Sequence, residues 1–384
     1  MKRVGVDIGS SAVRVVQVTG TDSKGYATIG RFAVAPLGEG AVVAGKIRNP
    51  QAVSLALSRA LKEAGASKYG FILGLASPEA AVAQLVLPAA IKPGERIGSI
   101  RADGRAIAPT LPLVDSALST NVLRIDTTGE GTAAVTLVVA AALRSEVDLL
   151  RQVCKLSNCV PQAIDLAGAA TMRALVRDRL NSANVATVVD LGMTKVTIVT
   201  REGLHVRSIR TAPGGGTELT RAIAGAGEWT FQEAEARKRS MHVGTRSTAP
   251  STSALEEPGA YSGYGIMEET TSGEDVRVMQ NVEDAVNAAV DSLVDQVAQS
   301  IEIDADLHHS MTRGVTLCGG TSLLRGLKDR LQQRVGTEVH VGRPWAHLEP
   351  SKRHTAHFRS GVEDPQLLLQ LTTATGLALW RKEQ

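Results

Sequence analysis

Apolar and polar residues alternate with the two-residue period of a β-strand at the start of the chain, and the same arrangement returns near its middle. Residues 4–16 place an apolar run before Asp7, a Gly/Ser turn after it, and a second alternating run behind the turn. Residues 185–199 repeat this order around Asp190. Each stretch predicts a β-hairpin with an aspartate at the end of its first strand. Two such hairpins, one in each half, predict two similar domains with a ligand between them.

The rest of the first half predicts a mixture of strands and helices. Strands are expected at 3–7, 12–19, 26–34 and 69–76, with a helix capped by Asn49 before the last of them. Residues 77–134 contain five prolines among short segments and are interpreted as a small inserted subdomain. An apolar strand at 133–142 and helices at 144–156 and 166–180 follow, with residues 161–164 leading into the second helix.

The second half shows the same alternation of elements. We expect strands at 204–211, 314–318 and 338–342, and helices after the glycines at 214–216 and at 229–241, 276–307, 323–334 and 365–380. Residues 244–274 are rich in Ser, Thr, Gly, Pro and Glu and predict a mobile, disordered loop, because they bury too little apolar surface to become ordered. The expected domains are 1–181 and 182–384, with a second subdomain at about 220–307.

Composition narrows the class of protein. A length of 384 residues suits two domains, and 43% hydrophobic with 21% charged residues is ordinary for a globular protein. An aromatic content of 3% and a net charge of +3 argue against nucleic-acid binding. The three cysteines form no metal-binding pattern, and we expect buried, reduced thiols. No signal peptide or run of about twenty apolar residues is present, so a cytoplasmic protein is expected.

The two hairpins also carry the candidate chemistry. Carboxylates such as Asp7 and Asp190 can hold hydrated Mg²⁺, which gives up its water reluctantly. Small turns let backbone and hydroxyl groups approach phosphate oxygens, and the residues expected to do so are Gly9, Ser10 and Ser11 in the first turn and Gly192, Met193 and Thr194 in the second. The alternative is two ordinary hairpins in which aspartate serves the turn.

Three further motifs are compatible with a nucleotide. Gly214, Gly215 and Gly216 precede a helix and can bring its N-terminus and unbonded amides near a sugar or phosphate, although such glycines often only close a turn. Gly319, Gly320 and Thr321 lie between a strand and a helix, where a purine ring could approach. Glu235 and Lys238 are one helical turn apart and either bind a ribose or form a solvated ion pair.

These motifs occur in the order typical of the actin-like ATPase superfamily. Within it the chain resembles the PilM-like type IV pilus assembly proteins, relatives of the FtsA division proteins, most clearly at residues 4–14, 138–141 and 376–380. The resemblance implies an α/β, actin-like (ribonuclease H-like) two-domain ATPase fold with inserted subdomains. It also implies a cleft that binds ATP, with Mg²⁺ near Asp7 and Asp190, and the ribose and adenosine near the motifs at 214–216, 235–238 and 319–321.

The resemblance further implies a position for the residue that orients the attacking water. Asp165, before the helix that leaves the first domain, is the candidate. Its side chain is short, so ATP hydrolysis is expected to be slow or absent. The alternative is that Asp165 caps the helix.

The inserted region resembles the extra subdomain of FtsA and PilM proteins. In PilM-like proteins a groove beside it receives the cytoplasmic N-terminal segment of PilN, an inner-membrane protein. The resemblance therefore implies a cytoplasmic ATP-binding scaffold of the pilus platform that reaches the inner membrane through a PilN-like partner. Other platform proteins and copies of itself are further candidate partners. The alternatives are an FtsA-like filament-forming protein and a small-molecule kinase. FtsA ends in an amphipathic membrane helix, and the helix expected at 365–380 has the character of core packing instead.

Overall fold

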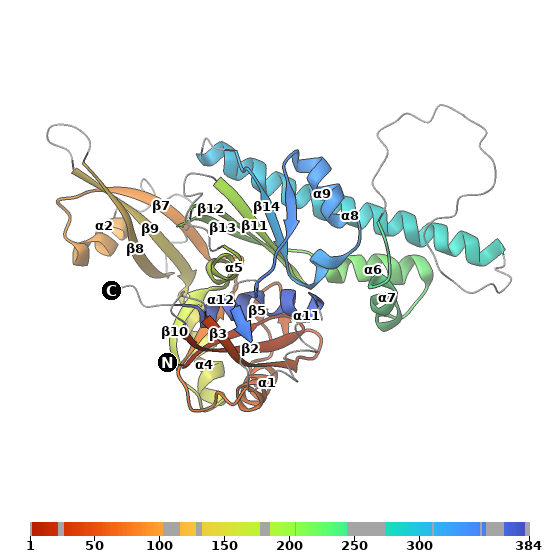
Figure 1. Ribbon diagram of the computed structural model, residues 1–384, viewed down its shortest axis with the longest axis horizontal. Helices are drawn as coiled ribbons and strands as arrows, with labels where there is room; N and C mark the ends of the chain where they lie inside the picture. The colour runs from red at the N-terminus through yellow and green to blue at the C-terminus, as the bar shows by residue number, and fades with distance from the viewer. Residues whose placement is uncertain are drawn as a thin grey trace.

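The first hairpin belongs to a six-stranded sheet and the second hairpin to a five-stranded sheet (Figure 1). The computed structural model describes residues 2–21, 27–102, 116–127, 133–176, 185–203, 205–243, 273–308, 311–345, 348–350 and 365–380. In each half an antiparallel meander of three strands comes first, and parallel strands are added beside its first strand. The repetition agrees with the prediction of two similar α/β domains.

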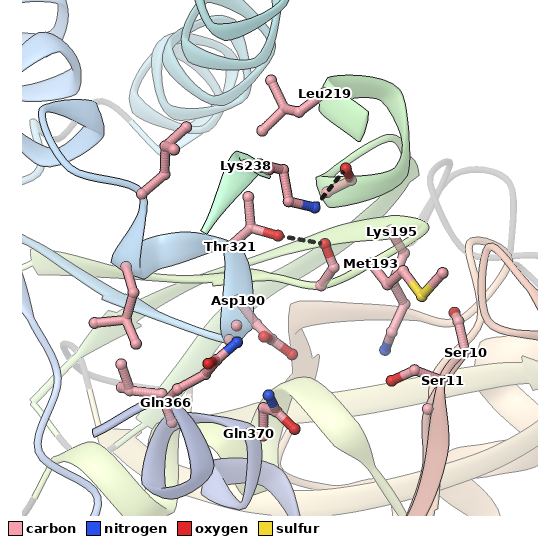
Figure 2. A pocket seen from close by; sticks show the side chains of 18 of the residues that line it. Ser10, Ser11, Asp190, Met193, Lys195, Leu219, Lys238, Thr321, Gln366 and Gln370 are labelled. Carbon is pink, nitrogen blue, oxygen red and sulfur yellow. Dashed lines mark hydrogen bonds between the residues drawn. The ribbon is translucent and has the colours of Figure 1, made fainter. Parts of the chain in front are cut away.

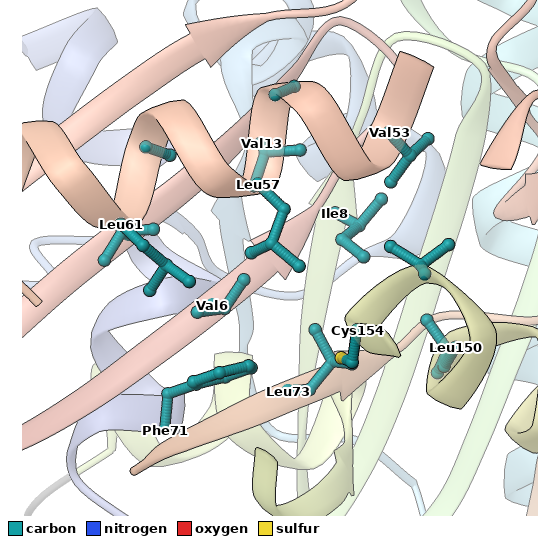
Figure 3. Close-up of a cluster of buried hydrophobic side chains, with 14 of the residues drawn as sticks. Val6, Ile8, Val13, Val53, Leu57, Leu61, Phe71, Leu73, Leu150 and Cys154 are labelled. Carbon is teal, nitrogen blue, oxygen red and sulfur yellow. The ribbon is translucent and has the colours of Figure 1, made fainter. Parts of the chain in front are cut away.

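The first sheet has the order β10-β6-β1-β2-β3-β16. Its meander consists of β1 (Lys2–Ile8), β2 (Ala12–Thr21) and β3 (Ala27–Pro36), and its parallel strands are β6 (Phe71–Leu75) and β10 (Pro161–Leu166). Alternate residues of β1 face the helices α1 (Pro50–Glu63) and α4 (Arg144–Leu156), and their apolar side chains form one core (Figure 3). Asn49 caps α1 as predicted, its side chain accepting a hydrogen bond from Ala52 N.

The second sheet has the order β13-β12-β11-β14-β15. Its strands are β11 (Val185–Leu191), β12 (Lys195–Glu202), β13 (His205–Pro213), β14 (Val315–Cys318) and β15 (Val339–Val341). The helices α6 (Gly216–Gly227), α7 (Phe231–Lys238), α8 (Gly273–His308) and α9 (Leu327–Val335) share a second core with this sheet. Helix α9 begins later than expected, because residues 320–323 form the short 3₁₀ helix η3 (Gly320–Leu323) and Gly326 follows it in a left-handed conformation.

The inserted region forms a sheet of its own with the order β7-β9-β8. Its strands are β7 (Ala81–Pro88), β8 (Ser116–Thr127) and β9 (Ala133–Leu143), and η1 (Pro93–Glu95) and α2 (Arg96–Ala102) follow β7. Strand β9, which we assigned to the first domain, is the central strand of this sheet, so the insertion extends past its expected end at about residue 134. An apolar run indicates that a strand is buried, but it does not specify which sheet the strand joins.

The prediction for residues 161–180 is confirmed in part: a helix is present, but a strand precedes it, and residues 177–180 lie outside the described residues. Residues 161–166 form β10, and the helix that follows, α5 (Ala167–Leu175), ends at Val176, whose backbone is extended. Helix α5 contacts strands of both large sheets and so lies between the two halves. The short β10 carries no alternating pattern, and its pairing with β6 supplies the strand.

The end of the chain returns to the first sheet. Strand β16 (Leu348–Pro350) pairs with β3, and helix α12 (Thr372–Ala378) packs on β1, β2 and α5 (Figure 1). The domain expected at 182–384 therefore gives its last segments to the other half. The single helix expected at 365–380 is two helices, α11 (Pro365–Gln370) and α12, separated at Leu371. Most of the loop predicted at 244–274 lies outside the described residues, and residues 273–274 open α8.

Candidate functional site: a cleft between the two hairpins

A cavity of about 500 Å³ lies between the two halves of the molecule (Figure 2). The first half contributes the β1–β2 hairpin and α11, and the second half contributes the β11–β12 hairpin, α6, α7 and the turn after β14. Predicted site residues that line it are Asp7, Gly9, Ser10, Ser11, Asp190, Gly192, Met193, Gly216, Glu235, Lys238, Gly319, Gly320 and Thr321. The fold thus gathers residues of five separate motifs around one space.

The first hairpin supplies a paired acid and base. Asp7 and Arg14 are opposite each other on β1 and β2, and Arg14 Nη1 lies 3.8 Å from Asp7 Oδ2. Both residues are buried, and Arg14 Nη2 also donates to Ser11 Oγ at 3.0 Å. Within the described part of the chain, Arg14 Nε is buried and has no hydrogen-bond partner. A guanidinium with an unused donor at the wall of a cavity suits an anionic ligand.

The second hairpin places an unpaired carboxylate in the same cavity. Asp190 borders the cavity between the halves, and its burial there raises the pKa of its carboxyl group. The charge of Lys195 opposes this rise in pKa and the charge of Asp7 adds to it, so all three groups are close enough to influence one another. No ion pair within 4 Å joins Asp190 or Lys195 to another described residue. Two carboxylates and two cations therefore face one space.

Backbone hydrogen bonds fix the turn of the second hairpin. The carbonyl oxygens of Gly192, Met193 and Thr194 accept from the amides of Gly216, Thr217 and Gly214, at 3.0, 2.8 and 3.3 Å. The unbonded amides that we expected at 214–216 are therefore already used at Gly214 and Gly216. These three bonds hold the start of α6 against the hairpin, and Gly216 alone of the three glycines lines the cavity.

The turns of the two hairpins touch each other. Ser10 Oγ and Thr194 Oγ1 are 2.5 Å apart, and Thr194 Oγ1 also accepts a hydrogen bond from Ala44 N at 3.0 Å. Ser10 and Ser11 line the cavity, whereas the hydroxyl of Thr194 is occupied by this contact between the halves. The two predicted phosphate turns are thus adjacent.

The turn after β14 supports Asp190. A Cβ atom on Gly319, whose φ is +82°, would lie 2.4 Å from both Asp190 Oδ1 and Leu191 O, so this position requires glycine. Thr321 donates its hydroxyl hydrogen to Gly192 O at 3.0 Å. Residues 319–321 therefore line the cavity and also brace the second hairpin.

Glu235 and Lys238 form an ion pair, but not the solvated one of the alternative prediction. Lys238 Nζ lies 2.5 Å from Glu235 Oε2 and also donates to Thr220 Oγ1 and Gly216 O at the start of α6. Burial lowers the pKa of Lys238. Burial alone would raise the pKa of Glu235, but hydrogen bonds from Lys238 and Thr220 outweigh it and lower that pKa. A half-buried, polar pair at the cavity wall can bind ligand hydroxyl groups.

Comparison with known proteins identifies the family. The sequence profile described as "Type IV pilus assembly protein PilM" matches residues 5–249, more than half of the 384 residues. The chain belongs to the PilM family. A second profile, "MreB/Mbl protein", matches residues 167–346.

This PilM-family protein resembles several solved structures in fold. A "PilM-PilN type IV pilus biogenesis complex" superposes with a TM-score of 0.75 at 20% sequence identity, covering 98% of this chain and 97% of the other. The ethanolamine utilization protein EutJ from Carboxydothermus hydrogenoformans superposes with a TM-score of 0.51 at 16% identity, covering 99% and 89%. The predicted actin-like fold is confirmed. Among the helices that the structure describes, none combines the length and apolar character needed to cross a membrane.

Asp165 does not join the cleft of this PilM-family protein. It lies on β10 beside a separate cavity of about 420 Å³. Its Oδ2 pairs with Arg173 Nη2 at 3.0 Å, and its Oδ1 accepts from Leu166 N at 2.9 Å. The cap residue of α5 is Leu166, which makes no side-chain cap bond, so Asp165 does not cap this helix.

Several residues that line the cleft were not predicted from the sequence. Arg14 and Lys195 are buried cations beside valines on hairpin strands, and this break in an apolar pattern was an available signal. Gln366 and Gln370 come from α11, which reaches the cleft only because the end of the chain returns to the first sheet. No local pattern marked these two residues.

The carboxylates of the cleft fit a metal ion only if a nucleotide supplies further ligands. Among the residues described, no group of three or more His, Cys, Asp or Glu side chains could hold a metal on its own. Mg²⁺ prefers six oxygen ligands and keeps several waters. Asp7 and Asp190 could hold such an ion through water if phosphate oxygens supplied the remaining ligands.

Proposed function

We propose that this protein is an ATP-binding scaffold of the type IV pilus inner-membrane assembly platform. In this proposal it binds the cytoplasmic N-terminal segment of a PilN-like membrane protein beside the insertion, in a way that depends on nucleotide. The observation that carries the proposal is the cleft, where acidic, cationic and glycine-rich motifs from both halves converge. Membership of the PilM family supports the place in pilus assembly.

The cleft has the volume and chemistry that ATP requires. A cavity of about 500 Å³ is within the usual range for small-molecule sites. In this proposal Arg14, Lys195 and the serines of the first turn, which line the cavity, would contact the phosphates, and Glu235 with Lys238 would contact the ribose. Leu219, Phe231 and Leu324 offer an apolar wall to a purine. Bound Mg²⁺ would neutralise part of the phosphate charge, and the residues of the chain would position the nucleotide.

The partner site is proposed at the base of the insertion. A cavity of about 420 Å³ lies between β9, α4 and β10, and another of about 260 Å³ lies beside α4 and the start of the insertion. Strand β10 is at the edge of the first sheet, so an extended peptide could pair with it. The resemblance in fold to a PilM–PilN complex supports a PilN-like occupant. Binding there would bring the protein to the inner membrane.

One apolar cluster connects the cleft with the insertion. It contains Val82 of β7, with Val138 and Ala140 of β9 packed against it, and it reaches Ile209 of the second sheet. Leu369 and Leu323, which line the cleft, belong to the same cluster. Close-packed clusters transmit small displacements, which supports a dependence of partner binding on nucleotide.

The kinase alternative loses its candidate base. A small-molecule kinase needs a general base that faces the nucleotide, and Asp165, the candidate that the sequence offers for this role, pairs with Arg173 outside the cleft. We therefore favour binding of ATP with slow or no hydrolysis.

Titration calorimetry with ATP and Mg²⁺ tests the nucleotide site. We expect saturable binding by the parent protein and a loss of about 30-fold or more in affinity for Asp7→Ala, since a ligand-facing carboxylate is removed. A synthetic peptide of the cytoplasmic N-terminal segment of a PilN-like protein, titrated with and without ATP, tests the partner site. Absence of ATP binding, or equal ATP binding by Asp7→Ala, contradicts the nucleotide role. Absence of peptide binding contradicts the partner role.

A further inference from the structure

A short hairpin that the sequence did not suggest lies beside the cleft. It consists of β4 (Val42–Val43) and β5 (Lys46–Ile47), joined by Ala44 and Gly45. Both turn residues have positive φ angles, +49° for Ala44 and +83° for Gly45. A two-residue turn of this kind fits the twist of a hairpin and is tight. Ala44 carries a Cβ in this conformation, so its surroundings hold the turn in place.

One side of this hairpin contacts the turn of the β11–β12 hairpin in the other half of the molecule. The amide of Ala44 donates to Thr194 Oγ1 at 3.0 Å, across 150 positions of sequence. The same oxygen makes the 2.5 Å contact with Ser10 Oγ. Three turns therefore meet at the hydroxyl group of Thr194: the tip of the 42–47 hairpin, the turn of the β1–β2 hairpin and the turn of the β11–β12 hairpin. A displacement of either turn changes the bond to Ala44.

The opposite side of the hairpin contacts the entrance to the insertion. A Cβ atom on Gly45 would lie 2.0 Å from Ala76 O, so the backbone of the turn is pressed against the residue that follows β6. Lys46 Nζ forms an ion pair with Glu79 Oε1, and Glu79 Oε2 accepts a hydrogen bond from Ser77 Oγ at 2.9 Å. Residues 76–79 are the chain segment that leads into β7, the first strand of the insertion.

The hairpin also forms one wall of the smaller cavity. Gly45, Lys46, Ile47 and Arg48 line it together with residues 74–77 and the start of α4. The cavity and the insertion entrance thus share the hairpin as a common neighbour. Three consecutive residues, Ala44, Gly45 and Lys46, join the cleft on one side to this region on the other.

We infer that the 42–47 hairpin couples occupancy of the cleft to the conformation of the insertion entrance at residues 76–79. This inference rests on the proposed function, because it takes a nucleotide as the occupant. Phosphate groups placed between the two hairpin turns compete for the hydroxyls of Ser10 and Thr194 and so alter the acceptor of the Ala44 amide. The tight turn has little freedom to absorb the shift, and Gly45 and Lys46 pass it to Ala76 and Glu79. The coupling is limited by the difference in nucleotide affinity between the two arrangements.

Hydrogen–deuterium exchange on the full chain, with and without AMPPNP and Mg²⁺, tests the inference. In the parent we expect nucleotide to change exchange by about fivefold or more both at 42–47 and at 76–81, the lower end of ordinary coupling strengths. Lys46→Gln removes the ion pair to Glu79 without touching the cleft. It should bind AMPPNP within about twofold of the parent and keep the change at 42–47, while the change at 76–81 falls below about twofold.

A matched control is Arg59→Gln, which removes an exposed ion pair with Glu63 on α1, away from the hairpin. It should behave as the parent does. A full response at 76–81 in Lys46→Gln overturns the inference, as does bound AMPPNP with no change at 42–47 in the parent. Absence of AMPPNP binding by calorimetry overturns the proposed nucleotide function and the role of the hairpin together. AMPPNP binding by the parent with no change in exchange at 76–81 overturns the role of the hairpin alone.

Discussion

The two hairpins that face the cleft share a local design and differ in their surroundings. In the first, Asp7 is opposite Arg14 and pairs with it. In the second, Asp190 is opposite Thr197, and no described residue forms an ion pair with it within 4 Å. The first hairpin is electrostatically compensated within itself. In the second hairpin, the charge of Asp190 is balanced by Lys195, at the other end of the turn, and by a ligand that enters the cleft.

The turns of the two hairpins show the opposite difference, because the second turn has more contacts with other elements than the first. The turn at 192–194 is held by three amides of the 214–217 segment and by the Thr321 hydroxyl, all from other elements. The turn at 9–11 is held mainly by its own strand, with one backbone bond from Leu37 N to Ser11 O at 2.9 Å. The turn of the second hairpin is therefore held in place by other elements. The turn of the first hairpin has fewer such contacts, although the aspartate of that hairpin is paired. Four measurements can break or sharpen this contrast.

The largest expected difference is between the two buried cations. Arg14→Met breaks the pair with Asp7 and should lower the free energy of unfolding by about 3 kcal/mol, because a buried charge loses its partner. It should also lower ATP affinity about 100-fold. Lys195→Met should weaken ATP binding similarly but lower the free energy of unfolding by less than about 1.5 kcal/mol, since it removes no close ion pair. Urea unfolding and calorimetry compare them, and equal destabilisation would contradict the contrast.

The next contrast is between glycines beside each aspartate. In Gly319→Ala the new Cβ would lie 2.4 Å from both the backbone oxygen of Leu191 and Asp190 Oδ1, with φ at +82°, and the change should destabilise the protein by about 3 kcal/mol. Gly9→Ala meets the end of the Arg14 side chain at 2.3 Å, which can move, so we expect about 1 kcal/mol. Thermal unfolding of both variants measures the difference. A larger loss for Gly9→Ala would show that the first turn is the rigid one.

A smaller effect is expected where the turns meet. Thr194→Val loses contacts with both Ser10 and Ala44 and should cost about 2 kcal/mol, whereas Ser10→Ala loses one contact and should cost about 1 kcal/mol. The double variant should cost less than the sum, because both single changes remove the same bond. Additive costs in urea unfolding would mean that the two hydroxyls do not interact.

The smallest expected change concerns the unpaired carboxylate and depends on pH. Burial raises the pKa of Asp190 above its ordinary value of 3.8. Between pH 3.8 and that raised pKa the folded protein binds more protons than the unfolded chain, so its stability falls as pH rises through this interval and stays at the lower value above it. Asp190→Asn should therefore unfold at a higher temperature than the parent at neutral pH, with the difference vanishing as pH falls toward 3.8. Asp7→Asn, which unpairs Arg14, should show no such gain. Scanning calorimetry across pH decides the matter.

Much of the fold could be predicted because its signals are local. The period of two residues in both hairpins, the Asn49 cap and the glycines before α6 specify their elements through neighbouring residues. The grouping of Asp7, Asp190, Glu235, Lys238 and residues 319–321 around one cavity followed from the order of motifs. Boundaries were less accurate, as at α5 and α9, where pairing or a left-handed glycine set the start of the helix.

The sequence by itself determined the two hairpins, the alternation of strands and helices and most of the residues that line the cleft. Only the tertiary structure decided that β9 belongs to the insertion, that α11 brings Gln366 and Gln370 to the cleft, and that Asp165 pairs with Arg173. It also decided that the glycine-rich amides at 214 and 216 serve the second hairpin. The physical reason is that a residue pattern records whether a position is buried and how the backbone turns there. The partner that satisfies each buried group comes from elsewhere in the chain.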